Sequence, residues 1–131
     1  MTPLQREAWF VYHAPTAETK PKYEQIRACE TTVYNRVLDA EYYMSSPDLH
    51  SAINEECLRF ADLVMALAPD CEDRATAIEH IRMARHAFNE WAVVVRRDPS
   101  KPRDNKFLEM GKDELVKARW KSNSAIACGG V

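Results

Sequence analysis

The sequence predicts an all-α protein, a helical hairpin or small helical bundle, and three observations favour this class. Only three glycines occur in 131 residues, which leaves little material for the tight turns of β-hairpins. Seven prolines divide the chain into segments of helical length. Within those segments, apolar residues recur at three- and four-residue steps, the period of an amphipathic helix.

The first predicted helix is short. Thr2-Pro3-Leu4-Gln5 resembles a capping box with proline at the first helical position, and Pro15 disfavours helix in the residue before it, so the segment should end near His13.

The second predicted helix begins near Pro21, with Thr19 as its candidate cap. Its buried face is predicted to hold six side chains, Tyr23, Ile26, Val33, Val37, Ala40 and Met44. Glu30 is the one polar residue that interrupts this face.

Two further helices follow. Ser45-Ser46-Pro47-Asp48 combines residues that end one helix and start the next, and Pro69 ends the third segment. The predicted stripe of that segment is Leu49, Ile53, Cys57, Phe60, Val64 and Leu67. Asp70 is a candidate cap for the fourth segment, whose stripe of Ala77, Ile81, Ala84, Phe88, Trp91 and Val95 is the strongest periodic signal in the chain.

Residues 96–106, RRDPSKPRDNK, carry two prolines and many charges, and we expect a linker or exposed loop there. A weaker helix is predicted from Asp113 to Ala127. We therefore assign residues 1–97 to a main helical domain and residues 98–131 to a linker with a C-terminal helix.

Composition excludes several classes of protein. Apolar residues at 46% and charged residues at 29% are typical of a globular domain, and no apolar run approaches the ~20 residues of a membrane span. The polar N-terminus lacks the pattern of a signal peptide, so we expect a cytoplasmic protein without membrane partners. A net charge of -2 disfavours binding to duplex nucleic acid, although a small basic site for a small anion stays possible.

The sequence carries no recognisable pattern for metal binding or catalysis. The four cysteines form no C-x-x-C pair, and we interpret Cys29 and Cys57 as core residues. No Glu-x-x-His pair occurs, and the acidic neighbours at 55–56 and 72–73 point about 100° apart on a helix, which suits one shared ion poorly. We expect no metal, no cofactor and no catalytic residue, while separated residues could still meet in the fold.

A basic stripe runs along the fourth predicted helix. Arg82, Arg85, Asn89 and Arg96 recur by three, four and seven residues and so share one face. These arginines could simply form a solvated flank that pairs with neighbouring glutamates. Asn89 is unusual in such a flank, because asparagine forms helix poorly and offers a donor and an acceptor suited to a base edge or a ribose.

The stretch FVYHAPTAETKPKYEQIR, residues 10–27, adds complementary groups. Tyr12 could stack on a purine, His13 and Lys22 could contact phosphate, and the Arg27 fork fits phosphate bidentately. The alternatives remain open: Tyr12 could pack the first helix onto the bundle, His13 could close a turn, and Lys20 and Lys22 could serve solubility alone.

Together these segments resemble the small phage proteins that sequester cyclic nucleotide immune signals, the sponge family of anti-CBASS and anti-Thoeris inhibitors. That family has an aromatic-Tyr-His-x-Pro opening, an Ile-Arg pair early in a helix, a proline-containing bend, and a helix that leads to an asparagine. The matching positions are Phe10 or Val11, Tyr12, His13, Pro15, Ile26, Arg27, Pro69, Ala77, Ile78, Ile81 and Asn89. Relative to the family, this chain carries an inserted segment near residues 29–58, and Ala87-Phe88-Asn89 stands where the family has Trp-Ala-Asn.

The resemblance implies a non-catalytic homo-oligomer that binds a cyclic dinucleotide, a cyclic trinucleotide or a relative of cyclic ADP-ribose in the host cytosol. The ligand-binding residues it suggests, with the basic stripe, are Tyr12, His13, Lys22, Arg27, Arg82, Arg85 and Asn89. Two other classes stay open. One is a protein-protein adaptor that docks through Trp9, Phe10, Tyr42, Tyr43 and Trp91, and the other is an enzyme that degrades the same signals.

Overall fold

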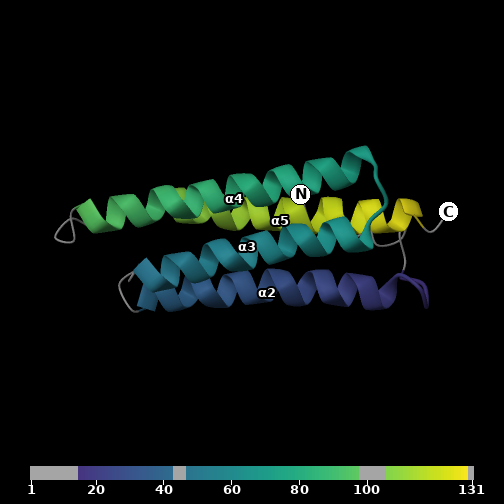
Figure 1. Ribbon diagram of the computed structural model, residues 1–131, viewed down its shortest axis with the longest axis horizontal. Coiled ribbons are helices and arrows are strands. Elements are labelled where there is room, and N and C mark those ends of the chain that lie inside the picture. The colour runs from purple at the N-terminus through teal and green to yellow at the C-terminus, as the bar shows by residue number, and fades with distance from the viewer. Residues whose placement is uncertain (1–14, 43–46, 98–105, 130–131) are drawn as a thin grey trace.

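The protein is all-helical in the part of the chain that the structure, a computed structural model, describes: residues 15–42, 47–97 and 106–129. Four helices follow one another, α2 (Lys20–Tyr42), α3 (Pro47–Leu67), α4 (Glu72–Arg97) and α5 (Lys106–Gly129) (Figure 1). The first predicted helix lies outside the described residues.

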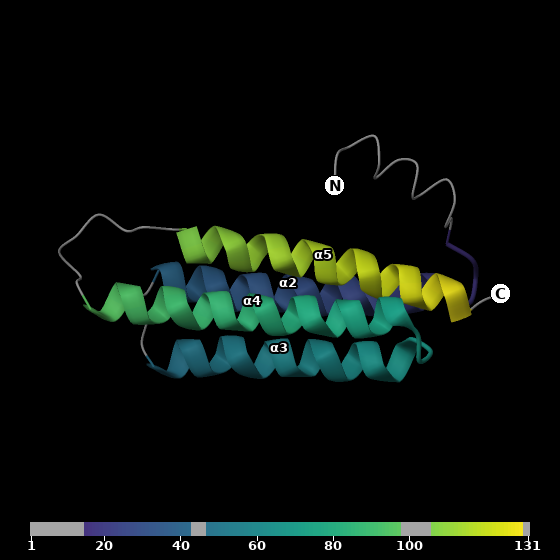
Figure 2. The same ribbon diagram turned by 90° about the horizontal axis from the view of Figure 1, so that it is seen from above.

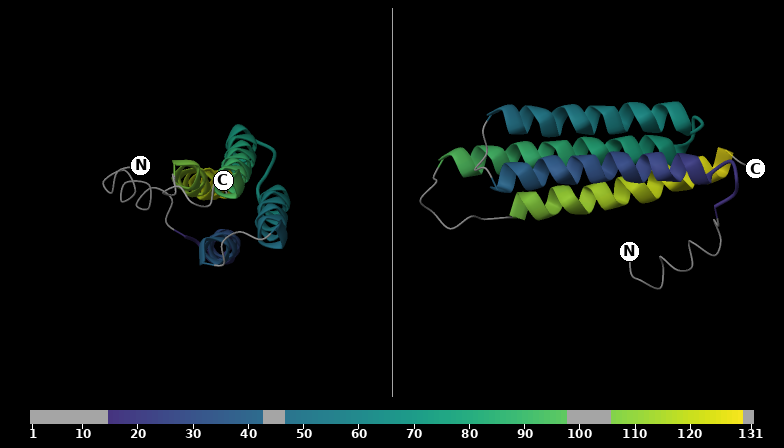
Figure 3. Two further views of the ribbon diagram at one scale, coloured as in Figure 1. Left: turned by 90° about the vertical axis from the view of Figure 1, so that its left-hand side faces the viewer. Right: turned by 90° about the horizontal axis from the view of Figure 1, so that it is seen from below.

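The four helices run side by side in an up-down-up-down bundle. α2 packs against α3 and α5, and α4 packs against the same two helices, so α2 and α4 occupy opposite corners. α3 and α5 form the other two corners, as Figure 2 and the right-hand view of Figure 3 show. The end-on view in Figure 3 shows the helices arranged around a common axis.

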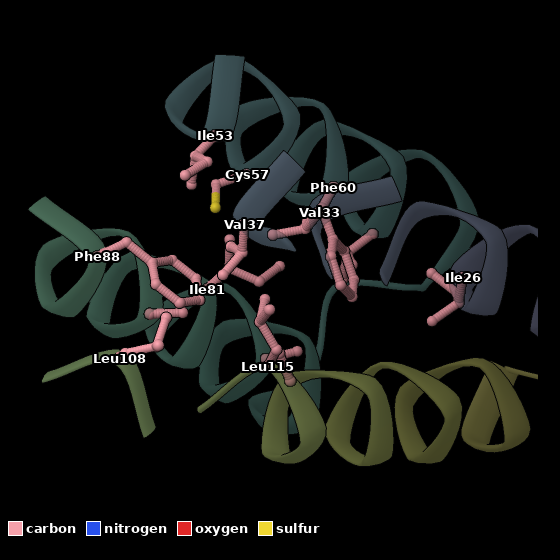
Figure 4. Packing of buried hydrophobic residues seen from close by; sticks show 14 of the residues in the cluster. Ile26, Val33, Val37, Ile53, Cys57, Phe60, Ile81, Phe88, Leu108 and Leu115 are labelled. Atoms are coloured by element: carbon pink, nitrogen blue, oxygen red, sulfur yellow. The ribbon is translucent and has the colours of Figure 1, made fainter. Parts of the chain in front are cut away.

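The predicted apolar stripes meet in one core (Figure 4). Buried members come from each of the four helices and include Val33, Val37, Phe60, Phe88 and Leu115. This confirms the all-α prediction and the stripes of the second, third and fourth segments, apart from Met44, Leu49 and Val95, whose side chains lie outside the described part.

The C-terminal helix is longer and more central than the sequence predicts. α5 begins at Lys106 rather than near Asp113, and it contributes Leu108, Leu115 and Ile126 to the core shared with the other helices. Most of the loop predicted over residues 96–106 lies outside the described residues, although α4 extends to Arg97.

Thr16 and Thr19 together form the turn that starts α2, and the Thr19 carbonyl accepts the N–H of Tyr23 at 3.0 Å, as its predicted position before the helix requires. The Thr16 backbone N–H donates to Thr19 Oγ1 at 2.8 Å, and the Thr19 N–H donates to Thr16 Oγ1 at 3.2 Å. This reciprocal pair has the form of a capping box, and the Thr16 carbonyl accepts the N–H of Lys20. At the start of α4, the Cys71 carbonyl accepts the N–H of Ala75 at 3.2 Å, so Cys71 occupies the position before the helix, while the predicted cap Asp70 forms an ion pair with Arg74 at 3.1 Å.

Glu30, the polar residue in the apolar stripe of α2, has a partner on α5. Arg119 Nη1 donates to Glu30 Oε1 at 2.8 Å, and the Glu30 side chain is only 4% exposed. Burial raises the pKa of Glu30, and the opposite charge of Arg119 partly offsets this effect.

Residues 29–58, which the family resemblance marks as an insertion, include core residues and interhelical contacts of the bundle.

α4 and α5 are joined by close packing and by polar contacts. A Cβ atom on Gly111 would lie 2.4 Å from Cε1 of the buried Phe88 ring, so the missing side chain is what lets this ring reach α5. Glu114 of α5 lies 2.6 Å from Nδ1 of His80, and Ser124 donates to Asp73 at 2.7 Å.

Within the described ranges, no helix combines the length and the apolar character that crossing a membrane requires.

Candidate functional site

A shallow hollow of about 190 Å³ opens between α3 and α4 on the surface of the bundle. It is lined by three residues of α3 and four of α4: Cys57, Leu58, Ala61, Ile78, Ile81, Arg82 and Arg85. We call this hollow the α3–α4 groove. Its positions recur every three or four residues on both helices, so the two faces that form the groove run alongside each other.

The groove has an apolar floor and a cationic edge. Ile81 is buried, whereas Leu58 at the rim is 50% exposed. Such a surface suits a ligand with a flat or apolar part and a negative charge.

The two arginines at the groove differ in their partners. Arg82 donates to both carboxylate oxygens of Glu79, which is the pairing expected of a solvated flank, and this hydrogen bonding lowers the pKa of Glu79. Arg85 is half-buried, and among the described residues no acidic side chain lies within ion-pair distance of it. Of the two arginines that line the groove in the described part of the chain, Arg85 is therefore the one that is available to an anionic ligand.

Cys57 forms part of the floor as a neutral thiol. Its side chain is buried, and burial raises its pKa to about 12, with the charge of Arg85 acting in the opposite direction. The thiol therefore stays protonated at neutral pH, and the prediction that Cys57 is a core residue is confirmed. Cys29, the other predicted core cysteine, is only partly buried.

Asn89 lies one turn beyond Arg85 on the same face of α4. Its Oδ1 accepts a hydrogen bond of 3.0 Å from Nδ2 of Asn54 on α3. Asn54 Nδ2 also donates to the His50 backbone carbonyl at 3.1 Å. The two amides thus bridge α3 and α4 at the end of the groove next to Arg85.

The structure brings together only part of the predicted set of ligand-binding residues. Arg82, Arg85 and Asn89 share one face at the groove. Lys22 and Arg27 lie on α2, at the corner diagonally opposite α4, and do not line the groove within one subunit. Tyr12 and His13 lie outside the described residues, and so does the side chain of Arg96.

The sequence assigned Trp91 both to the apolar stripe of the fourth segment and to the adaptor surface, and the structure bears out the stripe. Trp91 is 1% exposed and meets the His50 ring edge-on at a centroid distance of 5.6 Å, so it belongs to the core. Tyr42 is 78% exposed, and the other three aromatic residues of that surface lie outside the described part.

Sequence interpretation missed the contribution of α3 to the site. Asn54, like Asn89, is an asparagine within a predicted helix, where this residue type is unfavourable. The same signal that identified Asn89 could therefore have identified Asn54. Leu58 and Ala61 carry no comparable signal, because their role depends on how α3 lies against α4. Among the described side chains, no three His, Cys, Asp or Glu residues are grouped as ligands for one metal ion.

Comparison with known proteins adds no relative: no protein-family model matches the chain, and no curated protein or solved structure matches it significantly.

Proposed function

We propose that this protein binds a cyclic nucleotide in the α3–α4 groove and holds it without cleaving it. The observation that carries the proposal is Arg85, a half-buried guanidinium with no acidic partner in the described part of the chain, beside an apolar hollow. An arginine in this position is suited to the phosphate of a ligand whose ring contacts the apolar floor.

The lining supports binding rather than bond cleavage. A guanidinium stays protonated in proteins and cannot act as a general base. The Cys57 thiol, with a pKa of about 12, is a poor nucleophile at neutral pH. The remaining lining residues, Leu58, Ala61, Ile78 and Ile81, are apolar.

The proposal includes assembly as a homo-oligomer. The hollow is small and open, whereas a site that binds a small molecule tightly buries most of its surface. A second copy of the chain placed over the groove would enclose the ligand, and Lys22 and Arg27, together with Tyr12 and His13, could come from that copy. Such an assembly in the host cytosol would lower the free concentration of a signalling nucleotide, as the family resemblance implies.

Titration calorimetry with cyclic dinucleotides, cyclic trinucleotides and cyclic ADP-ribose tests the proposal directly. We expect at least one of them to bind with a dissociation constant below about micromolar. Arg85→Ala should weaken that binding about tenfold or more, because a charged hydrogen bond to phosphate is lost. Arg36→Ala is the matched control, since Arg36 is an exposed arginine of α2 that pairs with Asp39.

Binding of none of these ligands would contradict the proposal, and equal losses in the two arginine variants would remove the groove as the site. Incubation with the bound ligand, followed by denaturation, separates binding from degradation. We expect the ligand to be recovered intact, whereas an altered product would indicate an enzyme.

A second candidate function is protein-protein docking at the same face. Leu58 and Met65 are each 50% exposed and stand seven residues apart on α3, so they share one side of that helix. A protein partner recovered in stoichiometric amount, with no nucleotide bound, would favour docking over the proposed function.

A further inference from the structure

The Asn54–Asn89 pair has an orientation that the surrounding atoms determine. Asn54 Nδ2 lies 3.1 Å from the His50 carbonyl oxygen, which can only accept a hydrogen bond, so the nitrogen and not the oxygen of the Asn54 amide faces it. The second hydrogen of that nitrogen reaches Asn89 Oδ1 at 3.0 Å. Both hydrogens of Asn54 Nδ2 are therefore used, and the oxygen of Asn89 must face α3.

This orientation leaves one acceptor and one donor unused. Asn54 Oδ1 and Asn89 Nδ2 have no hydrogen-bond partner among the described residues. Because the two amides are hydrogen-bonded to each other, the free acceptor of one and the free donor of the other belong to a single polar patch. A donor and an acceptor in one polar patch are the groups that the edge of a nucleobase requires.

The pair lies in line with the groove. Arg85 and Arg82 precede Asn89 by four and seven residues on the same face of α4, which places them about 6 Å and about 10 Å along the helix axis. A ligand with its ring edge at the amides would therefore direct its phosphate toward the arginines.

We propose that Asn54 and Asn89 together recognise the base of the bound nucleotide, through an edge that presents a donor next to an acceptor, such as N6–H and N1 or N7 of adenine. This inference rests on the proposed function of the groove. It adds Asn54, from α3, as a specificity-determining residue and adenine as a base that the site accepts.

Asn89→Asp is the decisive variant. An aspartate at this position still offers an oxygen to Asn54 Nδ2, so the contact between α3 and α4 is kept, but the free donor becomes an acceptor. Two neighbouring acceptors suit the N1–H and N2–H groups of guanine and not the mixed edge of adenine. Asn35→Asp is the control, because Asn35 is exposed on α2 and its replacement adds the same charge.

The readout is the ratio of the dissociation constants for cyclic di-AMP and cyclic di-GMP, since added negative charge weakens both ligands alike. We expect Asn89→Asp to raise this ratio about tenfold or more relative to the unmodified protein, and Asn35→Asp to leave it unchanged. Thermal melting of each variant checks that the fold is kept.

An unchanged ratio in Asn89→Asp would overturn the inference, while cyclic nucleotide binding that still depends on Arg85 would leave the proposed function standing. Failure of the unmodified protein to bind either dinucleotide or any other nucleotide of the panel would overturn both.

Discussion

The two sides of α4 are packed in different ways. Toward α5, the helix makes close contacts, with Phe88 against Gly111 and with His80 bonded to Glu114. Toward α3, the same helix borders an open hollow with an arginine that has no acidic partner in the described part of the chain. The side of α4 that faces α5 is thus closely packed, whereas the side that faces α3 carries the groove that we propose as a ligand site.

The largest effect is expected from Arg119→Ala in α5, which breaks the pair that joins α5 to Glu30 of α2. Removing Arg119 leaves the carboxylate of Glu30 buried without its charged partner, and breaking such a pair costs about 3 kcal/mol of unfolding free energy. Urea denaturation at neutral pH measures the loss. Arg85→Ala, the same change on the α3 side, should alter stability by less than about 0.5 kcal/mol, because it leaves no buried carboxylate unpaired. Equal losses in the two variants would contradict the view that the contacts of α5 stabilise the bundle more than the arginine at the groove does.

A smaller loss is expected from Gly111→Ala. The added methyl group would overlap the ring of Phe88, which is 1% exposed and has little room to move. We expect a net loss of about 1 kcal/mol, since overpacking outweighs the better helix propensity of alanine. Thermal or urea unfolding measures it, and Phe88→Leu in the same chain should recover part of the loss.

Ala61→Leu is the counterpart of this change in the α3–α4 groove. It adds a larger side chain, yet the open hollow should admit it at a cost below about 0.5 kcal/mol. A cost above that of Gly111→Ala would mean that the groove is closed in solution.

The smallest effect concerns pH. Because burial raises the folded-state pKa of Glu30 above its unfolded value, this carboxyl group stabilises the fold at low pH. That contribution is lost as pH rises from 4.5 through the raised pKa. Relative to Glu30→Gln, the unmodified protein should therefore lose unfolding free energy over this range. Urea titrations on both sides of pH 4.5 measure the difference, and a gain with rising pH would show that Arg119 outweighs burial.

Sequence periodicity predicted the helices whose apolar stripe can be recognised within a single segment. The stripe from Ala77 to Trp91 repeats by four and three because each member faces the same core. The first turns of α5 were not predicted as helix. They contain Gly111, which weakens a helical pattern, and the need for glycine there comes from Phe88 of another helix. Glu30 was read as an interruption for the same reason, since its partner Arg119 lies 89 positions away.

The sequence predicted the α4 side of the candidate site but not its α3 side. Arg82, Arg85 and Asn89 repeat along α4, so their common face follows from helical spacing alone. The α3 residues beside them depend on the alignment of two helices, which no periodic pattern within either helix specifies. How Lys22 and Arg27 of α2 reach a ligand stays a prediction about assembly.

The buried thiol of Cys57 can report local separation of α3 from α4. Its thiol is fully covered beneath the groove, so a thiol reagent can reach it only when α3 and α4 separate locally. Cys128 is exposed and should react without such an opening. The ratio of the labelling rates of Cys57 and Cys128 would measure how often α3 and α4 separate at the groove. A ligand that bridges the two helices should slow the reaction of Cys57 and leave that of Cys128 unchanged.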